Sequence, residues 1–333
     1  MPSAPAIAAP AADAPHQAFH RGELHAQQRA GMLEKMAAIG PRVIRDFMPD
    51  QHREFFAQLP FMVVGSMDEQ GRPWASIMAG APGFVHSPDA HTLRVQSVRI
   101  AAGDPLRANL REGAKLGLLG IEPHTRRRNR VNGVVHALRE DGMEIAIEQS
   151  FGNCPKYIQA RKPELLDEDA SAATVATDAA TLTPQMQAMI GRADTFFIAT
   201  ALADDDAEAH GAGHRHGTDV SHRGGKPGFV RIDGDDTLTV PDFIGNSFFN
   251  TIGNLLVQPR AGLLFADFER GALLYLGVTA EVIWDGPEVE SFTGAQRLMR
   301  FTVQSARLLE HALPLRWSEA ALSPFLEPMG SWN

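Results

Sequence analysis

The sequence has little cysteine, no long apolar run and no surplus of basic residues, and each absence excludes a class of protein. Cys154 is the only cysteine in 333 residues, so the chain forms no internal disulfide, which is typical of a reducing compartment. No apolar stretch reaches the length that a bilayer span requires. The net charge of −9 argues against a general nucleic-acid binder. We therefore expect no membrane and no nucleic-acid partner.

The signatures of several enzyme classes are also missing. The chain contains no GxGxxG, no Walker loop and no HExxH motif, and no residue stands out as a catalytic acid or base. The start, MPSAPAIAAPAADAP, lacks the basic and apolar regions of a signal peptide, so we expect a disordered arm over 1–17 and a cytoplasmic protein. The insertion ADDDAEAHGAGHRHG carries three histidines at a spacing that matches no metal site, and we expect a disordered loop there.

What the sequence does contain is an internal repeat. Shifting the chain by 145 residues aligns 76–121 with 221–266 without gaps, and 14 of these 46 positions are identical. The identities include both PGFV quartets, both GLL triplets and the pair Asn109 and Asn254. Two unrelated hairpins that share turn chemistry are the alternative, but an ungapped register over this length favours a tandem duplication.

Each copy has the pattern of a helix, two strands, a PGFV strand, a TLxV strand, a helix that ends at NL and further strands. Antiparallel neighbours with one inserted helix predict a small barrel, which avoids exposed sheet edges. The predicted fold is mainly β (α+β), with two tandem split barrels, flanking helices and a pseudo-dimer within one chain. The predicted parts are the arm (1–17), helices and first barrel (18–150), a helix and linker (151–185) and the second barrel (186–333).

Local patterns add four expectations. Apolar residues at helical spacing predict helices between 18 and 47, broken at Gly40-Pro41. The run PFMVVGS, the turn DEQGRP and WASIMAG predict a hairpin. The segment SFGNCPKYIQARKPELL predicts a loop followed by a helix, and the small, polar residues 167–183 predict a linker.

Together these motifs resemble the FMN-binding split barrel of the pyridoxamine 5′-phosphate oxidase superfamily. The GRP turn, the PGFV strand, AGLLF and LGVTAEVIW carry the resemblance, and FHRGELHAQQRAG, SFGNCPKYIQAR, SHRGGKPGFVR and LPLRW make it most similar to the long tandem members. The resemblance covers residues 18–333. It implies two barrels packed side by side, often in a homodimer, with flavin in the grooves between them; a duplicated chain can form that interface within itself.

FMN requires cationic or N–H donors for its phosphate, an apolar slot for its ring and donors along the ring edge. Strand alternation predicts Ser221 and Arg223 on one face, with His222 between them. Because Arg223 has Met78 as its counterpart, we interpret the second hairpin as the binding one and the first as support. A solvated strand edge is the alternative.

The segment PDFIGNSFFNTIGNL predicts a strand end, a glycine turn and a helix start, in which Asn246 and Ser247 suit an N-cap. The resemblance implies phosphate contacts from Asn246, Ser247 and Asn250, and Asp242 precedes them in the expected site. The Arg-Lys pair that the oxidase tends to carry in this turn is absent. That absence weakens an assignment to pyridoxamine-phosphate oxidation, and ordinary helix capping is the alternative.

Two further segments contain candidate flavin-binding residues. HTRRRNRVNG is the most basic stretch, and on a strand Arg126, Arg128 and Arg130 share one face, so we expect Arg128 or Asn129 to reach the flavin across the groove. A solvated edge is the alternative. In LPLRW, Arg316 and Trp317 are expected to contact the isoalloxazine, with a hydrophobic anchor for the C-terminus as the alternative.

The leading hypothesis is an FMN-dependent oxidoreductase acting on a small organic substrate or oxygen, with NAD(P)H or a reductase partner as electron donor and a homodimer as a further possibility. A flavin carrier without turnover is the second hypothesis. Binding of FAD, deazaflavin or haem is the third, and His222 is the first candidate ligand for haem.

Overall fold

The computed structural model describes residues 18–167, 174–202 and 217–332. The first half consists of α1 (Arg21–Arg29), α2 (Leu33–Val43), α3 (Asp50–Ala57), β1 (Phe61–Met67), β2 (Pro73–Ala79), β3 (Val85–Asp89), β4 (Thr92–Gln96), α4 (Leu106–Asn109), β5 (Lys115–Glu122), a short 3-10 helix (Pro123–Thr125), β6 (Arg127–Arg139) and β7 (Gly142–Gly152).

Two short strands, β8 (Pro163–Leu165) and β9 (Val175–Ala179), lead to the second half. That half consists of α5 (Pro184–Arg192), β10 (Thr195–Leu202), β11 (Gly217–Gly224), β12 (Arg231–Asp233), β13 (Thr237–Phe243), α7 (Asn250–Val257), β14 (Arg260–Ala266), β15 (Leu273–Ile283), α8 (Pro287–Glu290), β16 (Ala295–Glu310), β17 (Leu315–Trp317) and a 3-10 helix (Pro324–Leu326).

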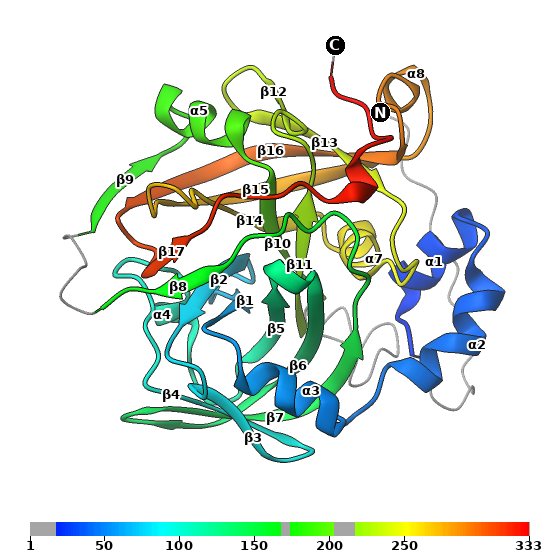
Figure 1. The fold of residues 1–333 in the computed structure, drawn as a ribbon. Coiled ribbons are helices and arrows are strands. Elements are labelled where there is room, and N and C mark those ends of the chain that lie inside the picture. Colours follow the sequence, from blue (N-terminus) through cyan, green and yellow to red (C-terminus); the bar gives the residue numbers. More distant parts are fainter. Residues whose placement is uncertain (1–17, 168–173, 203–216, 333) are drawn as a thin grey trace.

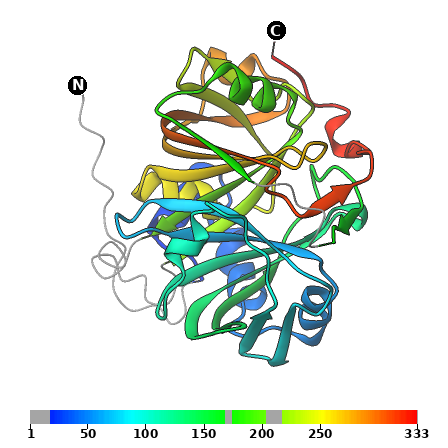
Figure 2. The same cartoon turned by 90° about the vertical axis from the view of Figure 1, so that its left-hand side faces the viewer.

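The two halves have the same sheet topology. In the first sheet the strand order is β2-β1-β5-β6-β7-β4-β3, and in the second it is β11-β10-β14-β15-β16-β13-β12, with β9 added beside β16. Each strand of one order therefore has its counterpart at the same place in the other. All described strand pairs are antiparallel, and Figures 1 and 2 show the two sheets stacked one above the other. The prediction of a mainly β chain with tandem halves is confirmed.

The sequence shift also gives the correct structural register. On β5 and β6, Leu119 lies opposite Arg130; on β14 and β15, Leu264 lies opposite Tyr275, 145 residues later in both cases. The shared asparagines have the same role: Asn109 Nδ2 donates to Ser66 Oγ at 2.9 Å. Asn254 Nδ2 donates to Thr200 Oγ1 at 3.0 Å. These contacts anchor α4 and α7 to the sheets in equivalent ways.

Each half buries its own apolar core, and a third core fills the contact between the halves. Two glycines at equivalent repeat positions allow that contact. A Cβ at Gly117 on β5 would lie 2.3 Å from the carbonyl oxygen of Thr218, and a Cβ at Gly262 on β14 would lie 2.3 Å from that of Pro73. Strand β11 therefore packs on β5, and β2 packs on β14, in a pseudo-twofold arrangement. The shared core contains Phe61, Val63, Ile77, Leu119, Phe197, Val220, Leu264 and Tyr275, among others.

The helices differ from the prediction at one point. Helix α2 continues through Gly40 and Pro41 to Val43 and does not break there. Pro41 lies in the last turn, where a missing N–H and the restricted φ disturb only the helix end. Gly40 serves close packing, because a Cβ there would lie 2.5 Å from the Phe19 ring.

Two predictions for the connection between the halves are wrong in part. The segment 153–165 contains no helix; it runs as a loop into β8, which pairs with β17. Within the expected linker, residues 175–179 form β9 and pair with β16. Both segments find sheet partners from the far end of the chain, which local composition does not encode.

The predicted boundaries at 150 and 185 fall inside β7 and α5, and the division into domains stays a prediction. The expected arm and the histidine-bearing insertion lie outside the described residues. Within the part of the chain that is described, no helix is both long and apolar enough to cross a membrane.

Candidate functional site

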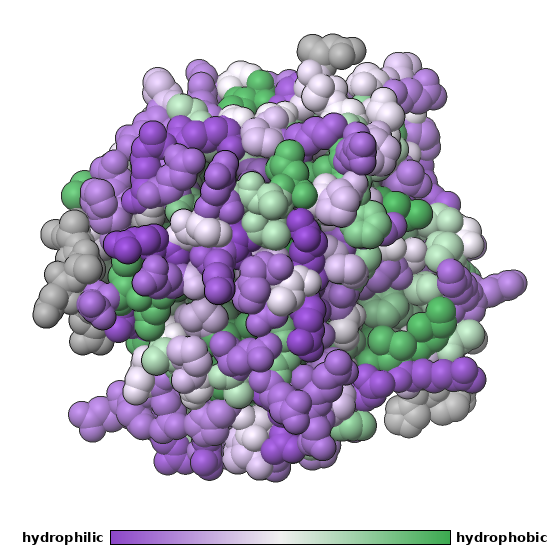
Figure 3. Space-filling model, viewed as in Figure 1, coloured by the Kyte–Doolittle hydropathy of each residue, from purple (hydrophilic) through white to green (hydrophobic). Residues whose placement is uncertain are grey.

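A cavity of about 330 Å³ lies between the halves, where β6 of the first faces β11 of the second. The α1–α2 connection and the turn before α7 complete its walls, and Figure 1 shows α7 lying between β11 and α1. In the same view, Figure 3 shows apolar surface around α1 and α2, beside this wall. The lining residues include Met32, Lys35, Arg128, Arg130, Cys154, Ser221, His222, Arg223, Asp242, Asn246, Ser247, Asn250 and Arg297.

The floor of the cavity is a polar contact between β6 and β11. Arg130 is 3% exposed and donates to Asp219 Oδ1 at 3.1 Å and to Ser221 Oγ at 2.5 Å. Asp219 also accepts from Asn132 and Asn254, each at 2.8 Å. Asp219 and Ser221 point the same way because alternate residues of a strand share a face. This network fixes the two halves relative to each other at the cavity.

A second buried carboxylate lies at the side of the cavity. Asp242, at the end of β13, is 4% exposed and forms ion pairs with both Arg223 and Arg297. One carboxylate thus serves two guanidinium groups, and Arg297 itself is 7% exposed. Two guanidinium groups and one carboxylate leave one positive charge uncompensated, and such a charge is costly in a buried place unless a ligand pairs with it.

Arg128 adds a further positive charge. Its Nε donates to the carbonyl of Cys154 at 2.7 Å and its Nη1 to that of His222 at 3.4 Å. Among the described residues no carboxylate forms an ion pair with it. Burial lowers the pKa of Arg128 to about 10, which still leaves it charged at neutral pH. The buried groups around the cavity are therefore four guanidinium groups and two carboxylates, a surplus of two positive charges, and the exposed Lys35 at the rim adds to it.

The turn before α7 supplies donors to the same cavity. The first N–H groups of a helix have no partner within it, and no side chain caps α7. Its first three residues line the cavity. Ser247 and Phe249 both have φ of 63°, a left-handed conformation that is uncommon outside glycine and is concentrated at functional sites. The N-cap is Phe249, so the expectation that Asn246 and Ser247 cap the helix is wrong. Asn246 Oδ1 instead accepts from the N–H of Phe248 at 3.1 Å.

The first half of the chain is similar in sequence to a known protein family. The family model for pyridoxamine 5′-phosphate oxidase matches residues 48–177, the first half of the duplicated fold. The first half of this chain is a pyridoxamine 5′-phosphate oxidase-like split barrel. The same strand order in residues 195–310 makes the second half of this split-barrel protein a copy of the matched one.

The solved structures that match parts of the chain are distant from it. HupZ of Group A Streptococcus is 16% identical over 37% of this chain and 89% of its own, with a TM-score of 0.28. A candidate pyridoxamine 5′-phosphate oxidase from Lactobacillus delbrueckii is 13% identical over 38% of this chain and 94% of its own, with a TM-score of 0.29. MrkH of K. pneumonia, in complex with c-di-GMP, is 10% identical over 77% of this chain and 83% of its own, with a TM-score of 0.21. No curated protein matches the chain.

Most residues expected at the site lie together in this split-barrel protein. Eight of the eleven line the cavity: Arg128, Ser221, His222, Arg223, Asp242, Asn246, Ser247 and Asn250. Asn129 does not, because on β6 it lies on the face opposite to Arg128. Arg126 does not share the face of Arg128 either, because β6 begins only at Arg127 and Arg126 has a left-handed φ of 56°. Its Nε donates to the carbonyl of Ile158 instead. Their roles as cofactor ligands stay a prediction.

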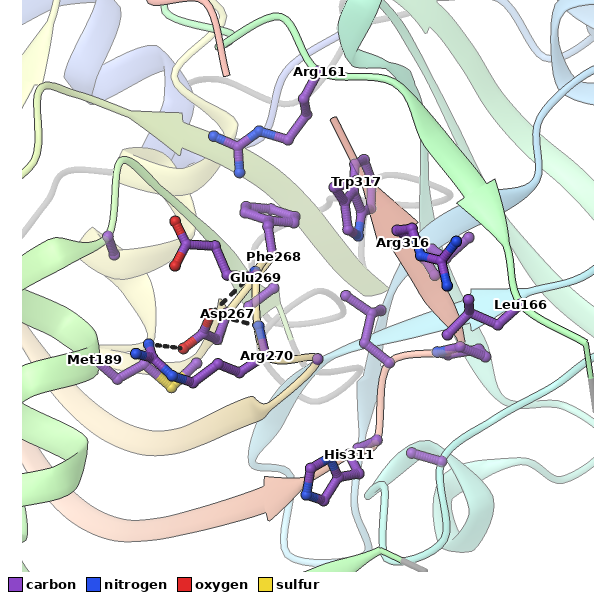
Figure 4. Close-up of a pocket in the computed structure, with 18 of the residues that line it drawn as sticks. Arg161, Leu166, Met189, Asp267, Phe268, Glu269, Arg270, His311, Arg316 and Trp317 are labelled. Atoms are coloured by element: carbon purple, nitrogen blue, oxygen red, sulfur yellow. Dashed lines mark hydrogen bonds and ion pairs between the residues drawn. The ribbon is translucent and has the colours of Figure 1, made fainter. Parts of the chain in front are cut away.

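Arg316 and Trp317 lie elsewhere. They line a separate cavity of about 950 Å³, shown in Figure 4, opposite Asp267 and Arg270. Trp317 packs edge-on against Phe61 and Phe268, at ring-centroid distances of 5.2 and 4.9 Å. The packing agrees with the alternative of a hydrophobic anchor near the C-terminus.

Sequence reasoning missed several residues at the site. Asp219 shares the face of Ser221 and Arg223 by strand alternation, so its position was available from the pattern. Arg297 and Glu23 come from β16 and α1, and no sequence pattern connects these elements to β11. Groups of three or more His, Cys, Asp or Glu side chains suited to a metal do not occur within the described residues.

The equivalent groove on the other side of the molecule is closed. There β2 faces β15, so Ser76, Met78 and Tyr275 take the positions of Ser221, Arg223 and Arg130. Asp104 accepts from Ser76 Oγ at 2.6 Å and from Tyr275 Oη at 2.7 Å. All four side chains are at most 3% exposed, and burial raises the pKa of Asp104. Leu273 stands where Arg128 stands in the open groove.

Proposed function

We propose that this protein binds FMN in the cavity between β6 and β11 and acts as an FMN-dependent oxidoreductase on a small organic substrate or oxygen. The observation that carries the proposal is the surplus of two positive charges beside the uncapped start of α7. A phosphate monoester carries close to two negative charges at neutral pH, and a helix N-terminus favours an anion. The family match supports a flavin as the phosphate-bearing molecule.

The residues present fit such a cofactor. Within the described chain, the Nε atoms of Arg130, Arg223 and Arg297 and the Nδ1 of His222 have no hydrogen-bond partner, although all are buried. A buried polar group without a partner is costly and indicates a ligand. Apolar side chains that also line the cavity, Met32, Phe243 and Ile244 among them, can cover a flat ring. The cavity lies at the small end of the range for ligand sites.

Flavin supplies the electron-transfer chemistry when it is bound. The role of this chain is to bind and orient it. Arg128, Arg223 and Arg297 would hold the phosphate or the electron-rich ring edge, and Asp242 fixes the last two guanidinium groups in direction. Lys35 and Met32, from the α1–α2 connection, would limit the access of water.

The test is an absorption spectrum of the purified protein, with the released cofactor weighed by mass spectrometry. Bands near those of free flavin and the mass of FMN support the proposal; FAD or deazaflavin would appear as a different mass. Bleaching by NAD(P)H supports turnover, whereas bound flavin that no nicotinamide reduces supports a carrier. A colourless protein that binds no added FMN contradicts the proposal.

Haem is the second candidate because of one residue. His222 is 6% exposed, lines the cavity and has no hydrogen-bond partner at Nδ1. Burial, with Arg128 beside it, lowers its pKa well below the usual value, so the ring is neutral and suited to a metal. A Soret band that is lost in His222→Ala would support haem and contradict FMN as the resident cofactor.

A further inference from the structure

A carboxyl group lies buried behind the cavity, between α1 and the start of α7. Glu23, in the first turn of α1, is 4% exposed. Its Oε2 accepts from the backbone N–H of His20 at 2.9 Å. Its Oε1 accepts from Nδ2 of Asn250, the first residue of α7. Because Asn250 lines the cavity, Glu23 is one residue away from any ligand bound there.

Close packing of two helices holds Glu23 in this position. A Cβ at Gly22 would lie 2.1 Å from the carbonyl oxygen of Gly253, and a Cβ at Gly253 would lie 2.5 Å from Cγ of Glu23. Helices α1 and α7 are therefore in backbone contact, and the Glu23 side chain is enclosed between them.

Charged and titratable groups face Glu23 from three sides. The His20 ring lies on its own segment, with Nε2 at 3.6 Å from Oε2. Asp219, on β11, and Arg130, on β6, are near enough for their charges to act on it. Burial and then Asp219 raise the pKa of Glu23 to about 8; the bonds from His20 and Asn250 and the charge of Arg130 act in the opposite direction.

We propose that Glu23 is a positioning residue that couples proton uptake to anion binding in the cavity, holding Asn250 in place and carrying a proton while the dianion is bound. The inference rests on the proposed function. The physical reason is charge: an ionised Glu23 would cancel one of the two surplus positive charges that attract the phosphate. By linkage, a bound dianion favours the protonated carboxyl, and protonation favours the dianion to the same extent.

The experiment compares the wild type with Glu23→Gln, which keeps the size of the side chain and one of its two acceptor oxygens but cannot ionise. Apo-protein is titrated with FMN, and with sulfate as a competitor, between pH 7 and pH 9.5. Sulfate keeps its charge over this range, so a change in its affinity comes from the protein. We expect the wild type to lose roughly tenfold in affinity for both ligands as the pH rises, and Glu23→Gln to lose much less.

Asp104→Asn is the matched control, because Asp104 is also a buried carboxyl with a raised pKa but lies in the closed groove. It should keep the wild-type pH profile for binding. Equal profiles in the wild type and Glu23→Gln would overturn the inference while leaving the cavity as a binding site. If neither FMN nor sulfate bound to either protein at any pH, the proposed function would fail instead.

Discussion

Ser76 and Ser221 occupy the same position in the two halves, yet they face opposite surroundings. Ser221 lies beside Arg130 and Arg223 in an open cavity, whereas Ser76 lies beside Met78 and a carboxyl that binds Tyr275. The strands, the register and the glycine contacts are shared, so the scaffold allows two grooves. The two grooves differ in a few side chains: arginines line the open groove, whereas Met78, Tyr275 and Asp104 are buried in the closed one. Duplication therefore explains the shared scaffold, and a few substitutions explain why only one of the two grooves is a candidate site.

The pH dependence of stability should change most when Glu23 is exchanged. Because the pKa of Glu23 is raised from 4.5 to about 8, the folded state binds more protons than the unfolded state in that range, and stability falls as pH rises through it. At about 1.4 kcal/mol per pKa unit, the loss over the whole range is on the order of 5 kcal/mol. Glu23→Gln should remove most of this slope in chemical denaturation between pH 5 and pH 8. An unchanged slope would mean that Glu23 is ionised in the folded protein.

Exchange of Arg128 tests the difference between the two grooves. Arg128→Met should weaken FMN binding roughly 100-fold, because a hydrogen bond to a charged group contributes about 1.5–3 kcal/mol. The counterpart Leu273→Ala should cost about 2–5 kcal/mol of stability and leave FMN affinity unchanged. Fluorescence titration with FMN and thermal unfolding measure the two effects. Equal flavin affinity in both variants would show that the grooves do not differ in the proposed way.

Arg223 and Met78 form the second pair. Arg223→Ala should weaken FMN binding roughly tenfold, less than Arg128→Met, because its loss leaves Asp242 paired with Arg297 alone and removes that excess of positive charge. Met78→Ala truncates a fully buried side chain and should lower stability by about 2–5 kcal/mol without affecting flavin. A loss of flavin in Met78→Ala that matches the loss in Arg223→Ala would remove the asymmetry.

The shared asparagines should give the weakest effects. Asn109→Ala should cost about 1 kcal/mol of stability, the usual contribution of one hydrogen bond. Asn254→Ala should cost more, because Asn254 also donates to Asp219 on the cavity floor, and it should weaken FMN binding a few fold. Urea denaturation of both variants checks the difference. Identical stability and identical flavin affinity would show that the floor network has no effect on the site.

The repeat explains why so much of the fold and the site was predictable. An ungapped shift carries strand register with it, and the pairs Ser76/Ser221 and Arg223/Met78 follow directly. Alternation along β11 then places Arg223 at the groove. The contribution of β16 through Arg297 and of α1 through Glu23 depends on contacts between distant segments. A single sequence holds no signal for such contacts.

The failures have local causes. Proline and glycine at 40–41 suggested a helix break, but the glycine serves contact with Phe19. Asn246 and Ser247 are typical N-cap residues, yet two left-handed residues delay the start of α7 to Asn250. Trp317 and Arg316 have the chemistry of flavin contacts, but the β8–β17 pairing places them at another cavity.

The number of flavins per chain is the decisive quantity, because one groove is open and its equivalent is closed. Native mass spectrometry of the apo-protein mixed with excess FMN measures it. We expect one FMN per chain in the wild type and in Met78→Ala, and none retained in Arg128→Met at the same concentrations. Two FMN molecules per chain, or none in the wild type, would contradict the division of roles between the two grooves.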